Sequence, residues 1–254
     1  VYTTVTWGEQ LISYLYARTA AGGGASWFWD HADNRSLAVY PLAVEGDEQN
    51  LHSVTYTLRP WGIGGDIVFP PQDGLFRLDL QSMGEELILT QDFHPIGLSP
   101  DNKVVAYTEE NNVVQDQHTR ITVYDLTTTV MVPIDLAVGS ERGAGYAVFS
   151  PDNQYVAWME ASGWTMAETP NFHSRVRIAN RDGVVLADIP DTVFASVAAD
   201  PTARWVTPVG WLDGETLLVQ VGGDLANHPL IKVHYDGTGM AFLASGKFLD
   251  FLYP

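Results

Sequence analysis

The stretch GLSPDNKVVAYTEE (residues 97–110) is followed by a close copy, VFSPDNQYVAWMEA (residues 148–161), at an offset of 51 residues. Each copy opens with Ser-Pro-Asp-Asn and continues into an apolar, strand-like run. Proline presets the backbone for a turn, and asparagine tolerates the left-handed conformation that a tight turn demands. The motif is therefore predicted to be the entry turn of a repeated structural unit and not a duplicated active site.

Short strands rich in Val, Ile, Tyr and Thr follow each of these turns, and a looser third copy begins at VGWLDGETLLVQV (residues 209–221). We predict an all-β fold: a β-propeller of four-stranded antiparallel blades, forming a single domain over residues 1–254. About five units are visible, or six if the closing strand or a missing N-terminal part adds one. Their ranges are 1–45, 52–91, 92–138, 144–192 and 205–246, followed by a closing strand at 247–254.

Strict alternation of apolar and polar residues, with frequent turn dipeptides, argues against helices anywhere in the chain. The long irregular stretches are 19–25, 43–53, 110–119, 161–174 and 191–204. In a propeller these connections open on one face. Because loops on a rigid frame carry most binding and catalytic residues, we expect function at this face.

A family resemblance rests on three segments: FSPDNQYVAWME (149–160) with the following RDG (181–183), WLDGETLLVQV (211–221) and VHYDGTG (233–239). These segments resemble the TolB-like (WD-repeat-like) β-propeller repeat family, in which a Ser-Pro-Asp-Gly turn precedes an apolar strand. Asn replaces Gly in two of the turns. The resemblance covers residues 92–254, and residues 1–91 match by strand pattern only. It implies a propeller fold and no single activity.

Composition limits the classes of partner. The chain carries 13 basic and 31 acidic residues, a net charge of −18. This charge argues against nucleic acid and anionic membranes, which require a basic surface. The sequence has no cysteine, and no apolar run reaches the roughly 20 residues of a membrane span. A start at Val1 fits either a removed secretion signal or an excerpt, and we expect a secreted, periplasmic or cell-surface bacterial protein.

Three histidines recur at a spacing of 55 residues, each three residues before an expected third strand: His118, His173 and His228. Three imidazoles are good ligands for zinc, manganese or iron. Equivalent positions on successive blades lie on a ring, however, whereas metal bonds of about 2 Å require the ligands to converge. The sequence therefore predicts no metal and no other cofactor. If the protein does bind a metal, these three histidines are the candidate ligands.

Two loops that interrupt the repeat supply the candidate binding residues. Aromatic residues and methionine in the loop 161–174 are typical interface anchors, and the alternative is that they form the loop's own small core. The loop 109–118 is polar and acidic, which suits either a calcium-type oxygen cluster or a solvated loop. The predicted contact residues are Trp164, Met166, Phe172, His173, Asn111, Asp116 and His118.

Common catalytic signatures are missing from the sequence: it contains no G-x-S-x-G, H-E-x-x-H, P-loop or G-x-G-x-x-G motif. We therefore predict a non-catalytic binding or scaffold propeller that presents its variable loops to a protein or peptide partner. Two alternatives stay open. One is a propeller-type hydrolase or lyase acting on polysaccharides, and the other is an accessory propeller of a larger extracytoplasmic complex.

Overall fold

The structure is a computed structural model of the 254-residue chain. It describes residues 2–7, 10–16, 26–30, 35–46, 51–57, 75–79, 82, 84–89, 93–109, 120–137, 142–163, 172–223 and 228–248. Contacts between Cα atoms divide the chain into two compact units, one built on strands β1–β7 and the other on β8–β19 with one helix. Each unit is described by itself.

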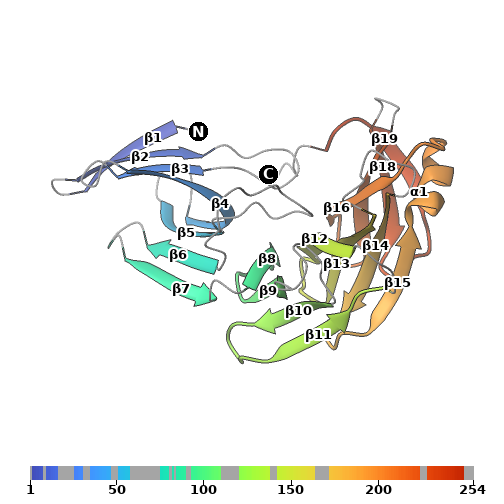
Figure 1. Cartoon of the computed structure of the whole chain (residues 1–254), viewed down its shortest axis with the longest axis horizontal. Helices are drawn as coiled ribbons and strands as arrows, with labels where there is room; N and C mark the ends of the chain where they lie inside the picture. Colours follow the sequence, from blue (N-terminus) through green and yellow to red (C-terminus); the bar gives the residue numbers. More distant parts are fainter. Residues whose placement is uncertain are drawn as a thin grey trace. The chain divides into compact units, whose positions relative to one another are not determined.

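The first unit is one antiparallel sheet of seven strands in sequence order (Figure 1). Its continuity depends on β4, which has 12 residues and pairs with β3 along its first part and with β5 along its second. The division of this region into units 1–45 and 52–91 stays a prediction. The strands are β1 (Tyr2–Trp7), β2 (Gln10–Tyr16), β3 (Ser26–Asp30), β4 (Arg35–Gly46), β5 (Leu51–Thr57), β6 (Leu75–Asp79) and β7 (Glu85–Leu89).

The second unit contains three four-stranded antiparallel sheets, each a meander of consecutive strands. The first sheet comprises β8 (Phe93–Leu98), β9 (Val104–Glu109), β10 (Arg120–Asp125) and β11 (Met131–Asp135). The second comprises β12 (Arg142–Phe149), β13 (Tyr155–Ser162), β14 (His173–Asn180) and β15 (Val185–Pro190). The third comprises β16 (Trp205–Trp211), β17 (Thr216–Gly222), β18 (Pro229–His234) and β19 (Ala241–Ser245). These sheets confirm the predicted all-β fold of four-stranded antiparallel blades.

The Ser-Pro-Asp-Asn turns have the predicted geometry. Asn102 and Asn153 adopt left-handed backbone conformations, with φ of 59° and 57°. In the first copy the Ser99 hydroxyl donates to Asp101 (2.7 Å) and accepts from the backbone N–H of Val104 (2.9 Å). The second copy repeats these bonds at the equivalent residues. Each turn is therefore closed by its own side chains and starts the strand that follows.

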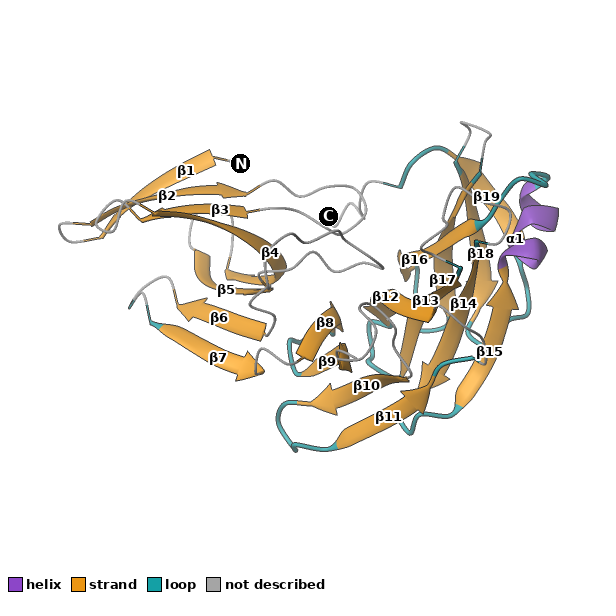
Figure 2. Ribbon diagram, viewed as in Figure 1, coloured by secondary structure: helices purple, strands orange, loops and turns teal. Residues whose placement is uncertain are grey.

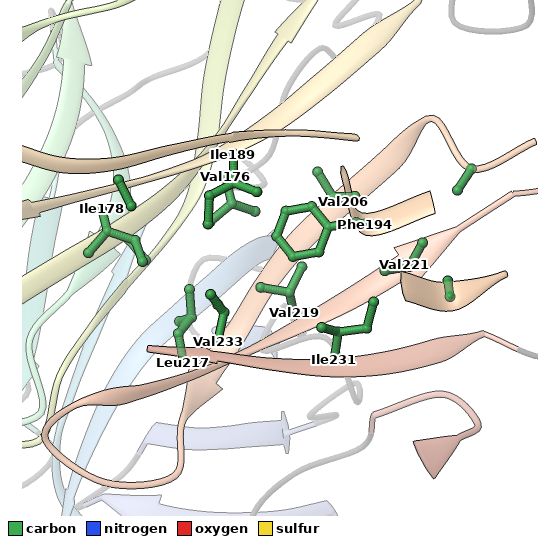
Figure 3. Packing of buried hydrophobic residues seen from close by; sticks show 14 of the residues in the cluster. Val176, Ile178, Ile189, Phe194, Val206, Leu217, Val219, Val221, Ile231 and Val233 are labelled. Atoms are coloured by element: carbon green, nitrogen blue, oxygen red, sulfur yellow. The ribbon is translucent and has the colours of Figure 1, made fainter. Parts of the chain in front are cut away.

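Apolar side chains from neighbouring sheets form the core of the second unit. One cluster lies between the sheets β12–β15 and β16–β19 and is completed by Phe194 (Figure 3). Another lies between β8–β11 and β12–β15 and includes Trp158. Both Trp158 and Phe194 are fully buried. The sheets are therefore stacked face to face, as a propeller requires.

One segment corrects the sequence-based interpretation. The stretch 191–204, predicted to be irregular, contains helix α1 (Asp191–Ala198), which packs beside β14 and β18 (Figure 2). Pro190 precedes the helix in an extended conformation, and Ala199 ends it in a left-handed conformation with φ of 54°. Proline suits the start of a helix because it lacks the N–H that would be unpaired there. The general exclusion of helices was therefore wrong at this segment.

Candidate functional site

Three strand pairs of the second unit are joined by the connections that this site involves: β9 and β10 by residues 110–119, β13 and β14 by 163–172, and β17 and β18 by the shorter 223–228. In the first two sheets these hairpin openings lie at the same end. Arg177 donates to the carbonyl oxygen of Asp135 (2.7 Å) near the openings. Arg181 donates to the Asp125 carboxylate (3.0 Å) at the opposite end of the same two sheets. The sheets β8–β11 and β12–β15 therefore lie side by side, with their hairpin openings at the same end.

The third sheet has the same alignment. Near the openings, the Ser174 hydroxyl donates to the carbonyl oxygen of Arg204 (2.6 Å). At the opposite end, the rings of Tyr155 and Trp211 stack with centroids 6.0 Å apart. We call the end with the openings the loop end, defined by the strand termini Glu109, Arg120, Ser162, His173, Gly222 and Pro229. The other end is the turn end, defined by residues 99–104, 150–155 and 212–216.

At the loop end a buried carboxylate holds a partly exposed histidine. The Nδ1 atom of His173 lies 2.9 Å from Oδ2 of Asp191. The His173 side chain is 47% exposed, whereas that of Asp191 is only 2% exposed. A carboxylate oxygen accepts hydrogen bonds, so the imidazole donates to Asp191 from Nδ1 and turns Nε2 away from this contact. A carboxylate that orients an imidazole in this way prepares the second nitrogen for a ligand or a proton.

Local structure explains the position of Asp191. It is the first residue of α1, where the unpaired N–H groups of the helix favour a negative charge. The same carboxylate oxygen also accepts the backbone N–H of Ser174 (3.4 Å). The hydroxyl of Ser174 in turn accepts the backbone N–H of Val206 (2.9 Å) from the next sheet. His173 is therefore fixed to a helix terminus and two sheets.

Three aromatic rings pack together near this contact: Phe172, Trp205 and Tyr146. Phe172 stacks on Trp205, with centroids 5.2 Å apart and planes at 13°. Tyr146 meets Trp205 edge-on at 6.4 Å and 78°. Phe172 is buried, whereas Tyr146 and Trp205 are half-buried. Burial raises the pKa of the Tyr146 hydroxyl above its ordinary value of 10.0. This hydroxyl therefore stays protonated at physiological pH.

A buried ion pair joins the first two sheets just below the loop end. Arg177 donates from Nη1 to Oε2 of Glu160 (3.0 Å), and Oε1 of Glu160 accepts the backbone N–H of Ala137 (2.7 Å). The guanidinium also lies 5.4 Å from the centre of the Trp158 ring. Loss of solvent raises the pKa of Glu160, although Arg177 acts in the opposite direction. The pair contacts backbone groups on the neighbouring sheet, which indicates a structural role.

Two of the seven predicted contact residues lie within the described part of the chain. His173 is exposed at the loop end, and its role as a contact residue stays a prediction. Phe172 is only 2% exposed and packs in a small core with Trp205. This arrangement corresponds to the alternative considered for the loop, in which its aromatic residues form a small core of their own. The remaining predicted residues lie outside the described residues: Trp164, Met166, Asn111, Asp116 and His118.

The described structure does not bring together the histidines considered as alternative metal ligands. His173 is bound to Asp191, and the carbonyl oxygen of His228 accepts a hydrogen bond from the Gln220 side chain (2.8 Å). Within the described ranges, no three His, Asp or Glu side chains come together in a group that could hold a metal ion. His118 lies outside those ranges. That the protein uses no metal stays a prediction.

Sequence reasoning missed Asp191, Tyr146 and Trp205. The dipeptide Pro190-Asp191 is a recognised helix start, and the Ala-rich run after it supports a helix. That signal was present in the sequence. Tyr146 carries no comparable signal, because its position depends on a bulge in β12 that the strand pattern does not reveal.

Comparisons with known proteins bear on the fold alone. No family model matches the chain, and no curated protein matches it. Among solved structures, dipeptidyl peptidase 4 from Porphyromonas gingivalis aligns with a TM-score of 0.50 at 11% identity, over 97% of this chain and 40% of that one. TolB from Acinetobacter baumannii aligns with a TM-score of 0.49 at 11% identity, over 95% of this chain and 53% of that one.

A putative TolB from Agrobacterium tumefaciens aligns with a TM-score of 0.47 at 15% identity, over 98% of this chain and 83% of that one. The chain thus spans about half the length of the Acinetobacter TolB and two fifths of the peptidase. The sheets and the similarity to the peptidase define the fold as a β-propeller. Membership of the TolB-like repeat family stays a prediction. The described part of the chain has no helix long and apolar enough to cross a membrane.

Proposed function

We propose that this chain is a non-catalytic binding propeller that presents its loop end to a protein or peptide partner. The observation that carries the proposal is the alignment of the three hairpin openings at one end of their sheets. The segments that depart most from the repeat, 109–120 and 160–175, join strands at this end. A regular frame with variable connections on one face is the usual arrangement of a recognition surface.

His173 is the described residue that best fits partner contact. Its imidazole is exposed and held by Asp191, so little side-chain entropy is lost when a partner binds. An extracytoplasmic location, and a place in a larger complex, belong to the same proposal. Both are tested by locating the chain in fractionated cells and by measuring the size of the assembly that contains it.

A photo-crosslinking experiment tests the loop end against the turn end. A photoreactive phenylalanine analogue replaces Trp164 in the loop 161–174, and in a matched control it replaces Asp182 in the turn that follows β14. Irradiation in cells of the source organism should give a defined cross-linked protein from position 164 and not from position 182. Equal cross-linking from both positions, or from neither, contradicts the proposal.

A second candidate function is favoured by the same histidine. A buried carboxylate bonded to an exposed imidazole is the arrangement of a general base, which supports a hydrolase or lyase acting on polysaccharides. This alternative predicts shortened or unsaturated products from neutral or uronic-acid polysaccharides. It also predicts that His173→Ala abolishes their formation, whereas His234→Ala, at the turn end, leaves it intact. A failure to detect product with any such polymer removes this alternative.

A further inference from the structure

The outer strand of the third sheet is an open edge. β19 (Ala241–Ser245) pairs with β18 and is the last strand in the order of its sheet (Figure 1). Four of its five residues are exposed. Two of these are large and apolar: Phe242 is 50% exposed and Leu243 is 45% exposed. A sheet edge presents unpaired backbone N–H and C=O groups, so it can accept a further strand. β19 therefore offers both backbone groups and apolar side chains for strand pairing.

The outer strands of the other two sheets provide an internal comparison. β11 has Pro133 in its middle and ends at Asp135. β15 contains Asp188, whose carboxylate accepts a hydrogen bond from Arg175 (3.0 Å), and ends at Pro190. Proline cannot donate a hydrogen bond to a further strand, and charged residues at an edge oppose pairing. β19, with the sequence Ala-Phe-Leu-Ala-Ser, has neither kind of residue. Of these three outer strands, β19 is therefore the one whose residues do not oppose pairing.

A bulge does not account for this difference. In β19 the register with β18 shifts between Leu230 and Ile231, which leaves Leu243 without an opposite residue. β15 has a comparable shift, which leaves Leu186 without an opposite residue in β14. Because both strands contain a bulge, the charge and the proline of β15 are what distinguish its edge from that of β19.

The sequence of β19 is suited to pairing with itself. When two copies of this strand meet antiparallel about a two-fold axis at Leu243, Phe242 of each copy lies opposite Ala244 of the other. Ala241 then lies opposite Ser245. Away from the axis no two large side chains are opposed, and no like charges face each other. A surface that is complementary to itself in this way is the basis of a two-fold dimer.

The distribution of charge favours this region for a contact between two copies. The chain has a net charge of −18, so two copies repel each other at long range. Residues 228–248, which contain β18 and β19, carry Lys232 and Lys247 against the single carboxylate of Asp236, a net charge of +1. Two copies can therefore meet at this hairpin without bringing many carboxylates together.

We propose that β19 is an interface between two copies of this chain. The two edge strands pair antiparallel about Leu243 and join two four-stranded sheets into one continuous sheet. This interface goes beyond the proposed binding function and does not depend on it, because it uses the outer strand of the third sheet and not the connections at the loop end.

The oligomeric state of the full chain tests the interface. Sedimentation equilibrium over a wide range of protein concentration should show a monomer–dimer equilibrium. Added salt should strengthen the dimer, because it screens the repulsion between two acidic chains. A monomer at every concentration overturns the inference and leaves the edge to a strand of another protein. Assemblies that grow beyond a dimer also overturn it, since a two-fold contact is closed.

One substitution and a matched control separate the edge of β19 from the rest of the surface. Leu243→Lys places two like charges at the two-fold axis and should weaken the dimer about tenfold or more. Met131→Lys is the control, because Met131 is 53% exposed on the outer strand β11 and receives the same charge there. It should leave dimer formation unchanged. A dimer that persists in Leu243→Lys, or that is lost equally in Met131→Lys, overturns the inference.

Disulfide cross-linking tests the register and decides the question if Leu243→Lys fails to fold. The sequence has no cysteine, so Leu243→Cys provides one thiol per chain. Opposed residues of antiparallel strands have Cα atoms about 4.5–5.5 Å apart, within the range that a disulfide spans. Mild oxidation should convert Leu243→Cys to a linked dimer, whereas Met131→Cys, treated in parallel, should stay monomeric on a denaturing gel. No linked dimer from position 243, or equal linkage from position 131, overturns the inference.

Discussion

The two ends of the sheets in the second unit are built differently. At the turn end, aspartates accept backbone N–H groups two or three residues away, as Asp213 does for Glu215 (2.8 Å) and Thr216 (2.7 Å). At the loop end, the bonds join residues far apart in sequence, such as Arg177 and Asp135. Long-range contacts also occur at the turn end, as between Arg181 and Asp125 (3.0 Å), but the turns there are already closed by their own side chains. The loop end depends on the assembled fold.

This difference assigns the two ends to different roles: the turn end belongs to the repeated frame, and the loop end carries the variable surface. A turn closed by its own side chains can be repeated in each sheet without reference to its neighbours. A contact such as that of His173 with Asp191 occurs once, because it needs one particular helix terminus beside one particular strand. Sites that recognise a partner are expected among such single contacts, and the substitutions below test both ends.

The largest effect is expected at the buried ion pair of the loop end. Arg177→Met leaves the carboxylate of Glu160 buried without its cation, and the Glu160 side chain is only 4% exposed. Breaking a buried pair by removing one partner destabilises a protein by about 3–5 kcal/mol. Urea unfolding followed by tryptophan fluorescence should therefore show a much lower midpoint.

The matched control removes both charges. The double variant Glu160→Leu with Arg177→Met leaves no buried ion, and replacing a whole pair with apolar residues is often nearly neutral. It should recover most of the lost stability. If the double variant is as unstable as Arg177→Met, the pair does not act through its charges.

A glycine of the frame should show the next largest effect. A Cβ atom at Gly97 of β8 would overlap the backbone carbonyl of Ala147 in β12, where two sheets approach closely. Because this neighbour is backbone and cannot rotate away, Gly97→Ala should destabilise the fold by about 1–3 kcal/mol. Gly214→Ala is the control: its Cβ atom would lie 3.3 Å from the exposed side chain of Asp152. Equal denaturation midpoints for the two variants contradict the close approach.

The repeat made much of the frame predictable from sequence. The turn motif, the alternation of the strands and the left-handed asparagines are local properties, and the structure confirms them at Asn102 and Asn153. Helix α1 was missed because one short helix in an all-β chain was read as a loop, although Pro190 and Asp191 marked its start.

The candidate site was less predictable. His173 was chosen for its recurrence, but its partner Asp191 is 18 residues away, and nothing in the spacing joins them. Trp205 and Tyr146 meet because two sheets stack face to face. Strand patterns reveal which residues are buried, but they do not reveal which residues of two neighbouring sheets face each other. Contacts between sheets therefore needed the structure.

A smaller effect is expected at the turns. Asn153 has a φ of 57°, and alanine in the left-handed region is strained by about 1 kcal/mol or somewhat more. Asn153→Ala should lower the free energy of unfolding by about that amount, whereas Asn153→Gly should be at least as stable as the unaltered chain. Urea unfolding measures both variants. A glycine variant as unstable as the alanine variant shows that the asparagine side chain, and not the backbone angle, supports the turn.

The smallest effect concerns pH at the turn end. His234 bonds through Nδ1 to Asp236 (3.0 Å) and lies near Glu215, and the hydrogen bond to Asp236 is the main reason that its pKa is raised above 6.5. A histidine with a raised pKa in the folded state stabilises the fold below its unfolded pKa, and this stability is lost as pH rises through the folded value. The Tm difference between the unaltered chain and His234→Gln should therefore be largest in mild acid and shrink above neutrality.

The pKa of Asp236 determines the pH below which the contact between His234 and Asp236 is lost. Its pKa is lowered to about 2, chiefly by the hydrogen bonds it accepts from Thr238, so its stabilising effect is present above its ordinary value of 3.8 and is lost as pH falls toward 2. In the Asp236→Asn background, His234→Gln should alter the Tm less than it does in the unaltered chain, because the main partner of the histidine is gone. An unchanged effect would show that Glu215 alone holds the charge, and the turn end would then owe less to its local aspartates than the comparison of the two ends requires.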